Sequence, residues 1–143
     1  MSKNKQSIIL FFLFLYSIYC AITVGQSWDE GFHLQQGKIT FNYLFSFGRI
    51  DKDIFYREFY SPIYWSIQYF LTNILPLKYQ IESSHLINLV FSLGVVFGIG
   101  SLTKNLFNRD VGKIVFLILF FYPIFFGHMA VNGSDSVLLF CNI

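Results

Sequence analysis

Apolar residues along the chain fall in long runs with almost no charge, rather than in the alternating pattern of strands. Three windows of this kind are separated by short polar stretches. An α-helix rises about 1.5 Å per residue, so roughly 20 apolar residues cross the hydrocarbon layer of a membrane, which is about 30 Å thick. The pattern therefore predicts three transmembrane helices, at about residues 8–26, 84–103 and 112–130.

The first window has a second interpretation, a cleaved signal peptide, because Lys3 and Lys5 precede its apolar core. That core is longer than the roughly 7–15 residues usual in a signal peptide. Tyr19 also breaks the small-residue pattern that cleavage near Cys20 would need. We therefore favour a retained helix.

The third window contains Pro123, which is expected to kink the helix or to end it early. The chain is then expected to leave the bilayer near residues 126–128 and to form a short outer loop at about residues 127–136. Residues 137–143 are apolar again and begin a predicted fourth span. A hydrophobic half-helix leaves its last carbonyls unsatisfied in lipid, so we expect the chain to be the N-terminal fragment of a longer protein.

The long segment at about residues 27–83, between the first two predicted spans, is mixed in polarity. We interpret its most apolar run, Phe59–Leu77, as an interfacial amphipathic helix rich in Tyr and Trp. Lys3 and Lys5 then share one side of the membrane with the basic loop between the second and third spans, as the positive-inside rule prefers. The N-terminus is therefore predicted to be cytoplasmic and residues 27–83 to lie outside.

The composition agrees with an integral membrane protein. Hydrophobic residues make up 55% of the 143 residues and charged residues 13%, about half the charged fraction usual in a soluble domain. The net charge is only +2, and no basic stripe interleaved with aromatics is present in the sequence, which argues against a nucleic-acid partner. Cys20 and Cys141 lie in apolar stretches, which argues against a disulfide framework or a metal cluster. We expect no metal and no cofactor.

Two polar clusters follow predicted spans on the same predicted face of the membrane: residues 28–33 after the first and residues 127–135 after the third. A carboxylate at headgroup depth can serve as a general base that draws a proton from an acceptor hydroxyl. Each cluster also has a purely structural interpretation. Asp29 and Glu30 suit the start of a helix, His128 suits an interface position bonded to backbone, and residues 132–135 suit a turn.

In combination these residues resemble a known family. The run WDEGFH at residues 28–33, with Gly37 following, resembles the first outer loop of membrane glycosyltransferases of the GT-C fold. It is most similar to bacterial members of glycosyltransferase family 39, relatives of the protein O-mannosyltransferases and of the aminoarabinose transferases of lipid A. Residues 125–128 (FFGH), Asn132 and Asp135 resemble a second motif of those bacterial members. The resemblance covers nearly the whole chain and implies an all-α, polytopic fold with interfacial helices in the first outer loop.

The resemblance also implies an activity and the roles of individual residues. The donor would be a polyprenyl-phosphate sugar, transferred with inversion to a protein, lipid or glycan acceptor on the outer face of the cytoplasmic (inner) membrane. Asp29 would be the catalytic base. Glu30, His33, His128, Asn132 and Asp135 would bind substrate. Three helices cannot enclose both substrates, so the fragment alone is expected to be inactive.

One loop departs from the family pattern. The relatives tend to have a proline and a basic residue between the asparagine and the aspartate, where this chain has Gly133 and Ser134. A phosphate contact would then come from a further part of the protein or from a cation of the outer segment, although headgroup anchoring is the more ordinary role of any one of those cations. The candidate cations are Arg49, Lys52, Arg57 and Lys78.

The competing hypothesis is a non-catalytic membrane subunit of a transporter or of a complex. Transporters usually carry polar or ionisable groups near the middle of the membrane. The middles of the predicted spans are almost bare of such groups, and the polar residues gather at one face. This asymmetry favours chemistry at the interface.

Overall fold

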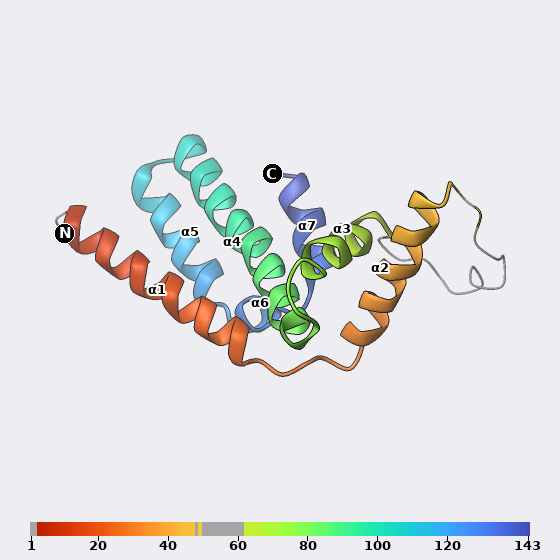
Figure 1. The fold of residues 1–143 in the computed structure, drawn as a ribbon. Helices are drawn as coiled ribbons and strands as arrows, with labels where there is room; N and C mark the ends of the chain where they lie inside the picture. Colours follow the sequence, from red (N-terminus) through yellow and green to blue (C-terminus); the bar gives the residue numbers. More distant parts are fainter. Residues whose placement is uncertain (1–2, 48, 50–61) are drawn as a thin grey trace.

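The computed structural model describes residues 3–47, 49 and 62–143, and within these residues the chain is helical, with no strand. The all-α prediction is confirmed for this part of the chain. Helix α4 runs through the middle of the arrangement, with α1 and α5 on one side of it and α2, α3 and α7 on the other (Figure 1). The elements are α1 (Lys3–Thr23), α2 (Glu30–Phe45), α3 (Pro62–Thr72), the 3-10 helix η2 (Leu77–Tyr79), α4 (Gln80–Leu106), α5 (Arg109–Phe121), α6 (Pro123–His128) and α7 (Gly133–Cys141).

The segment Leu77–Leu106, which comprises η2 and α4, is long and apolar enough to cross a membrane. It has 30 residues and a mean hydropathy of 2.0 over its most apolar window, and it contains the predicted span 84–103. The apolar stretch of α1, Ser7–Thr23, is shorter, and α5 has 13 residues. Among the described residues, the structure therefore supports one membrane-crossing helix by length and composition, where the sequence predicted three.

The third predicted span, residues 112–130, is not one continuous helix. Helix α5 ends at Phe121, Tyr122 is extended with φ −66° and ψ 114°, and Pro123 begins α6. A residue before proline disfavours the helical conformation, whereas proline itself fits the first turn of a helix. The predicted effect of Pro123 is confirmed, and it is larger than a kink, because it divides the segment into two helices.

The following loop is also shorter than predicted. Helix α6 continues to His128 and α7 begins at Gly133, so the connection is residues 129–132 rather than about 127–136. The predicted start of a further apolar helix at residue 137 lies inside α7. The polar residues 133–136 thus form the first turn of this helix instead of a loop.

Helices α2 and α3, which fall in the segment predicted to lie outside, pack on each other. The rings of Phe41 and Phe70 stack with their centroids 5.8 Å apart. Helix α3 covers residues 62–72 of the predicted interfacial run, while residues 59–61 lie outside the described residues. Its apolar side, which includes Ile63 and Ile67, is exposed, whereas its polar residue Gln68 is buried. The predicted amphipathic helix is therefore present, with its polar side turned toward the rest of the protein.

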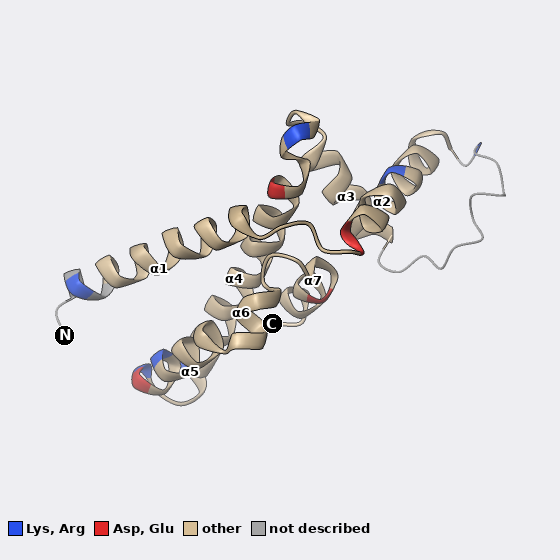
Figure 2. Ribbon diagram, turned by 90° about the horizontal axis from the view of Figure 1, so that it is seen from below, with Lys and Arg blue, Asp and Glu red and all other residues tan. Residues whose placement is uncertain are grey.

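Polar side chains are buried and large apolar side chains are exposed across much of the molecule. The largest fully buried side chains include His85, Gln68 and Asn88 beside Val95 and Val96. Large apolar side chains between Ile8 and Tyr19 of α1 are exposed around much of the helix rather than on one face. Figure 2 shows that the middles of α1 and α4 carry no charged residue, whereas α2 has one cation, Lys38, in its middle. A contiguous apolar exterior of this kind fits contact with lipid better than contact with water.

Candidate functional site

A stripe of polar residues on α4 organises the candidate site. His85, Asn88 and Ser92 are spaced three and four positions apart, so they lie on one face of the helix. Their side chains are almost completely buried. Hydrogen bonds from this stripe reach the end of α1, the start of α2, helix α3 and the connection between α6 and α7.

His85 joins α4 to both sides of the first polar cluster. Its Nε2 lies 2.7 Å from Oε1 of Glu30, and its Nδ1 lies 2.9 Å from the carbonyl oxygen of Ala21 at the end of α1. A carbonyl oxygen only accepts, so Nδ1 carries a proton, and the contact between Nε2 and Oε1 is made through one further proton. The pair therefore fixes the distance between the end of α1 and the start of α2.

Glu30 is buried, and both of its carboxyl oxygens form hydrogen bonds within the protein. The second oxygen, Oε2, accepts from the backbone N–H of Ser27 at 2.6 Å. Glu30 is the first residue of α2, so this bond ties the helix to the segment that precedes its N-cap. The structure thus places Glu30, predicted to bind substrate, where it positions the start of α2.

Asp29 precedes Glu30 and, unlike it, is not fully buried. It stands at the N-cap position of α2, yet its side chain forms no capping hydrogen bond and instead accepts one from the hydroxyl of Ser27. Asp29 is half-buried, and the neighbouring Trp28 is 98% exposed. His33, one turn further along α2, stacks on Trp65 with the ring centroids 4.0 Å apart. The structural interpretation of Asp29 as a capping side chain is therefore not supported.

The second polar cluster is bound to the same helix, α4. The side chain of Asn88 donates through Nδ2 to the carbonyl oxygen of Ala130 at 2.7 Å, and the hydroxyl of Ser92 donates to the carbonyl oxygen of Met129 at 3.0 Å. These two bonds hold the connection between α6 and α7 against the buried stripe. His128, which ends α6, is exposed.

Residues 132–135 form the start of α7. Asn132 donates through Nδ2 to Oδ2 of Asp135 at 2.8 Å, and Asp135 is exposed. A Cβ at Gly133 would lie 2.2 Å from both Oδ1 of Asn88 and the hydroxyl of Tyr64. No side chain fits there, so the glycine at this departure from the family pattern is required by close packing of α7 on α4.

The two clusters come together at one end of α4. His85 holds the first cluster and Asn88, one turn along the same face, holds the second. The ends of α1 and α6 and the start of α4 lie together at the lower end of the molecule in Figure 1. Glu30 of the first cluster and Ala130 of the second are therefore bound to adjacent turns of the same face of α4.

Helix α3 supplies residues that the sequence analysis did not single out. Tyr64 donates from its hydroxyl to Oδ1 of Asn88, and Gln68 donates through Nε2 to the same atom at 3.1 Å and to the hydroxyl of Ser84. Burial raises the pKa of the Tyr64 phenol, so this hydroxyl stays protonated and keeps donating. The helical spacing of His85, Asn88 and Ser92 in an apolar window was the signal that could have located this network.

The cations proposed for a phosphate contact are placed only in part. Lys52 and Arg57 lie outside the described residues, and Arg49 and Lys78 are exposed. The ammonium of Lys78 lies 5.6 Å from the centroid of the Tyr79 ring, a cation–π contact suited to anchoring at an interface. Within residues 3–47, 49 and 62–143, no group of three or more His, Cys, Asp or Glu is placed to hold a metal ion.

Comparison of the chain with models of protein families, with curated proteins and with solved structures found no match. The resemblance to glycosyltransferase family 39 therefore rests on the residues of the two motifs.

Proposed function

We propose that the chain is the N-terminal part of a membrane glycosyltransferase that takes a sugar from a polyprenyl-phosphate donor and passes it to an acceptor at the outer face of a cytoplasmic membrane. The observation that carries the proposal is the binding of both polar clusters to adjacent turns of α4, through His85 and Asn88. Residues from two distant parts of the sequence thereby line one end of the helices. A site for two substrates needs such a convergence of polar groups.

In this proposal Asp29 is the general base. Its carboxylate takes the proton of an acceptor hydroxyl as the acceptor oxygen bonds to the sugar carbon, and the lipid phosphate leaves from the opposite side, which inverts that carbon. The buried Glu30–His85 pair supports this role, because a base acts efficiently only when its surroundings fix its position. His33, His128, Asn132 and Asp135 are assigned to substrate binding.

The distribution of charge supports the proposed orientation. Lys5 of α1 and the basic residues Lys104 and Arg109 lie at the ends of their helices away from Asp29. The positive-inside rule then puts these cations in the cytoplasm and Asp29 outside. The exposed indole of Trp28 suits headgroup depth. With α4, the proposal takes α1 and the α5–α6 pair as further spans.

Replacement of the proposed base tests the activity. In the full-length protein, Asp29→Asn should lower sugar transfer from a polyprenyl-phosphate donor by about a hundredfold or more, while expression and membrane insertion stay unchanged. The matched control is Asp110→Asn, which removes a carboxylate at the other end of the molecule and should leave transfer unaltered. Full transfer by the Asp29→Asn protein would remove Asp29 from the mechanism.

Labelling in intact cells tests the orientation separately from catalysis. After replacement of Cys20 and Cys141 by alanine, single cysteines at the exposed positions Trp28 and His128 should react with a membrane-impermeant maleimide. A cysteine at Lys113 should react only after the cells are permeabilised. The reverse pattern would contradict an outer site and would favour the non-catalytic subunit.

A further inference from the structure

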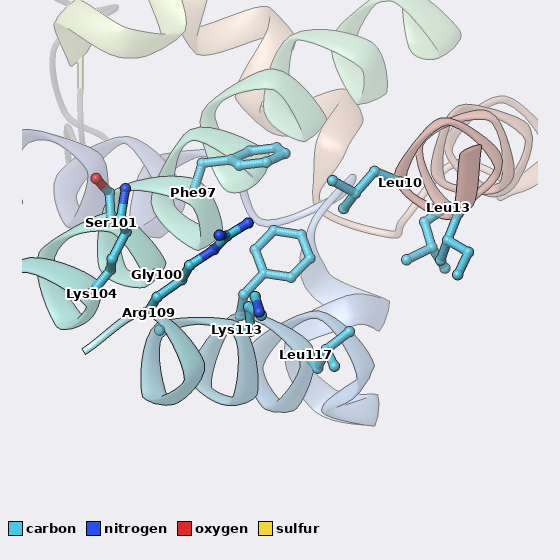
Figure 3. A pocket seen from close by; sticks show the side chains of 12 residues that line it. Leu10, Leu13, Phe97, Gly100, Ser101, Lys104, Arg109, Lys113 and Leu117 are labelled. Carbon is cyan, nitrogen blue, oxygen red and sulfur yellow. The ribbon is translucent and has the colours of Figure 1, made fainter. Parts of the chain in front are cut away.

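A groove lies at the end of the molecule away from Asp29, between the first half of α1 and the adjoining ends of α4 and α5 (Figure 3). Its volume is about 450 Å³, within the range of about 300–1,000 Å³ that is usual for small-molecule sites. Most of its wall is apolar and is formed by Leu10 and Leu13 of α1 and by Phe97 of α4. Three cations line the groove as well: Lys104, Arg109 and Lys113.

The packing of the three helices explains why the groove is open. The end of α1 is held on α4, where Ala21 is buried and hydrogen-bonded to His85. The first half of α1 diverges from α4, and Leu10 is 41% exposed (Figure 1). Helix α5 packs closely on α4, since a Cβ at Gly112 would lie 2.8 Å from the carbonyl oxygen of Gly100. The α4–α5 pair therefore forms a continuous floor, and α1 forms a separate wall.

The three cations differ in how closely they approach a carboxylate: the hydrogen bond and charge of Lys113 and, more weakly, the charge of Arg109 lower the pKa of Asp110. Lys113 is paired with Asp110, whose Oδ1 lies 2.8 Å from the ammonium, but no ion pair is formed by Lys104 or Arg109 in the part of the chain that the structure describes. Figure 3 shows the Arg109 side chain extending from the start of α5 into the space below Phe97. A guanidinium is well suited to bind phosphate through two parallel hydrogen bonds. The groove thus combines an apolar wall with three cations, of which Lys113 is paired with Asp110 and Lys104 and Arg109 form no close ion pair among the described residues.

We propose that this groove binds an anionic phospholipid, with one acyl chain along Leu10, Leu13 and Phe97 and the phosphate between Lys104 and Arg109. The occupant follows from charge complementarity, because a lipid with a phosphate and an acyl chain matches both parts of the lining. A basic pocket between membrane helices on the cytoplasmic side is a known kind of site for anionic headgroups. The site lies at the far end from Asp29, so the inference depends on a membrane location but not on the proposed transfer reaction.

Binding of phosphatidylglycerol tests the proposal on the full chain in detergent micelles, with phosphatidylcholine as the uncharged comparison and native mass spectrometry as the measurement. The chain should retain phosphatidylglycerol in preference to phosphatidylcholine. The double variant Lys104→Gln, Arg109→Gln should weaken this binding on the order of tenfold. The control Lys38→Gln, Lys78→Gln removes the same charge from exposed positions outside the groove and should bind as the parent does.

A second variant separates the lipid chain from the headgroup. Ser101 is exposed and lines the groove, so Ser101→Phe fills it while every cation is kept. It should also lose phosphatidylglycerol, and glycerol phosphate, which has no acyl chain, should not displace the lipid. Equal retention of phosphatidylcholine, an equal loss in the control double variant, displacement by glycerol phosphate, or a lipid-free dimer that fills the groove would each overturn the proposal.

Discussion

Two pairs of a carboxyl group with a nitrogen-containing side chain lie at opposite ends of the molecule. Their nitrogen–oxygen distances are nearly equal. Glu30 and His85 are 2.7 Å apart, with side-chain exposures of 5% and 0%. Asp110 and Lys113 are 2.8 Å apart, with exposures of 85% and 43%. The first pair joins residues 55 positions apart in the sequence, and the second lies within one turn of α5. The distance between the paired atoms is therefore no guide to what each pair does.

The difference in surroundings separates their roles. A buried pair is costly to desolvate and strongly destabilising to break, because the remaining partner is left uncompensated. An exposed pair is solvated, screened by salt and weak. The end of the molecule that carries Asp29 is thus held together by buried polar contacts. The opposite, basic end, which carries Lys104, Arg109 and Lys113, keeps its charges at the surface, where they can bind a ligand.

The largest expected effect comes from breaking the buried pair. Glu30→Ala should destabilise the fold by about 3–5 kcal/mol, because it leaves His85 and the N–H of Ser27 without their acceptor. Glu30→Gln should cost less, since the amide oxygen can still accept from Ser27. Thermal unfolding in detergent measures both. Asp110→Ala is the control at the exposed pair and should leave the unfolding midpoint nearly unchanged. Similar shifts of the midpoint in Glu30→Ala and Asp110→Ala would contradict the difference between the buried and the exposed pair.

A smaller loss is expected from the middle of the polar stripe. Asn88→Leu should destabilise the fold by about 1–3 kcal/mol, because Tyr64, Gln68 and the carbonyl of Ala130 lose their partner. Hydrogen exchange should also become faster in residues 129–132, which Asn88 holds on α4. Asn105→Leu is the control, since Asn105 is exposed on the same helix near its basic end. Equal exchange rates in the two variants would show that the stripe does not hold this connection.

The smallest effect concerns the pH response of the exposed pair. The hydrogen bond and the charge of Lys113 lower the pKa of the Asp110 carboxyl. A carboxyl whose pKa is lower in the folded state stabilises the fold above its ordinary titration range, and this contribution is lost as the pH falls through the lowered pKa. Lys113→Gln should therefore raise the pKa of Asp110 toward its ordinary value in a carbon-detected NMR titration. An unchanged titration would mean that the pair is not formed in solution.

The elements that depend on short stretches of sequence were predicted well. The apolar window at residues 84–103 predicted the centre of α4, and Pro123 predicted a break in the third window. The convergence of the two polar clusters at one end was also expected. A continuous helix over residues 112–130 was not formed, because the restriction on Tyr122 and the fixed conformation of the proline combine to end one helix and start another.

The site differs more from its prediction than the fold does. Glu30 was predicted to bind substrate beside the base Asp29, whereas the structure buries Glu30 against His85 and leaves Asp29 half-buried. The hydrogen bond from Asn88 to Ala130 and the close packing of Gly133 against Asn88 and Tyr64 were not predicted. Both arise from contacts between helices that are remote in the sequence.

The sequence by itself determined the helical class, the apolar exterior and the place where proline interrupts a helix, because these follow from the residues within a few turns of one another. Only the tertiary structure decided that Glu30 meets His85 and that Asn88 meets Ala130. The polar stripe of α4 indicates which face turns inward, but the hydrophobic pattern does not specify the partners of that stripe. The choice of partners depends on which polar groups of the neighbouring helices need a hydrogen-bond partner away from water.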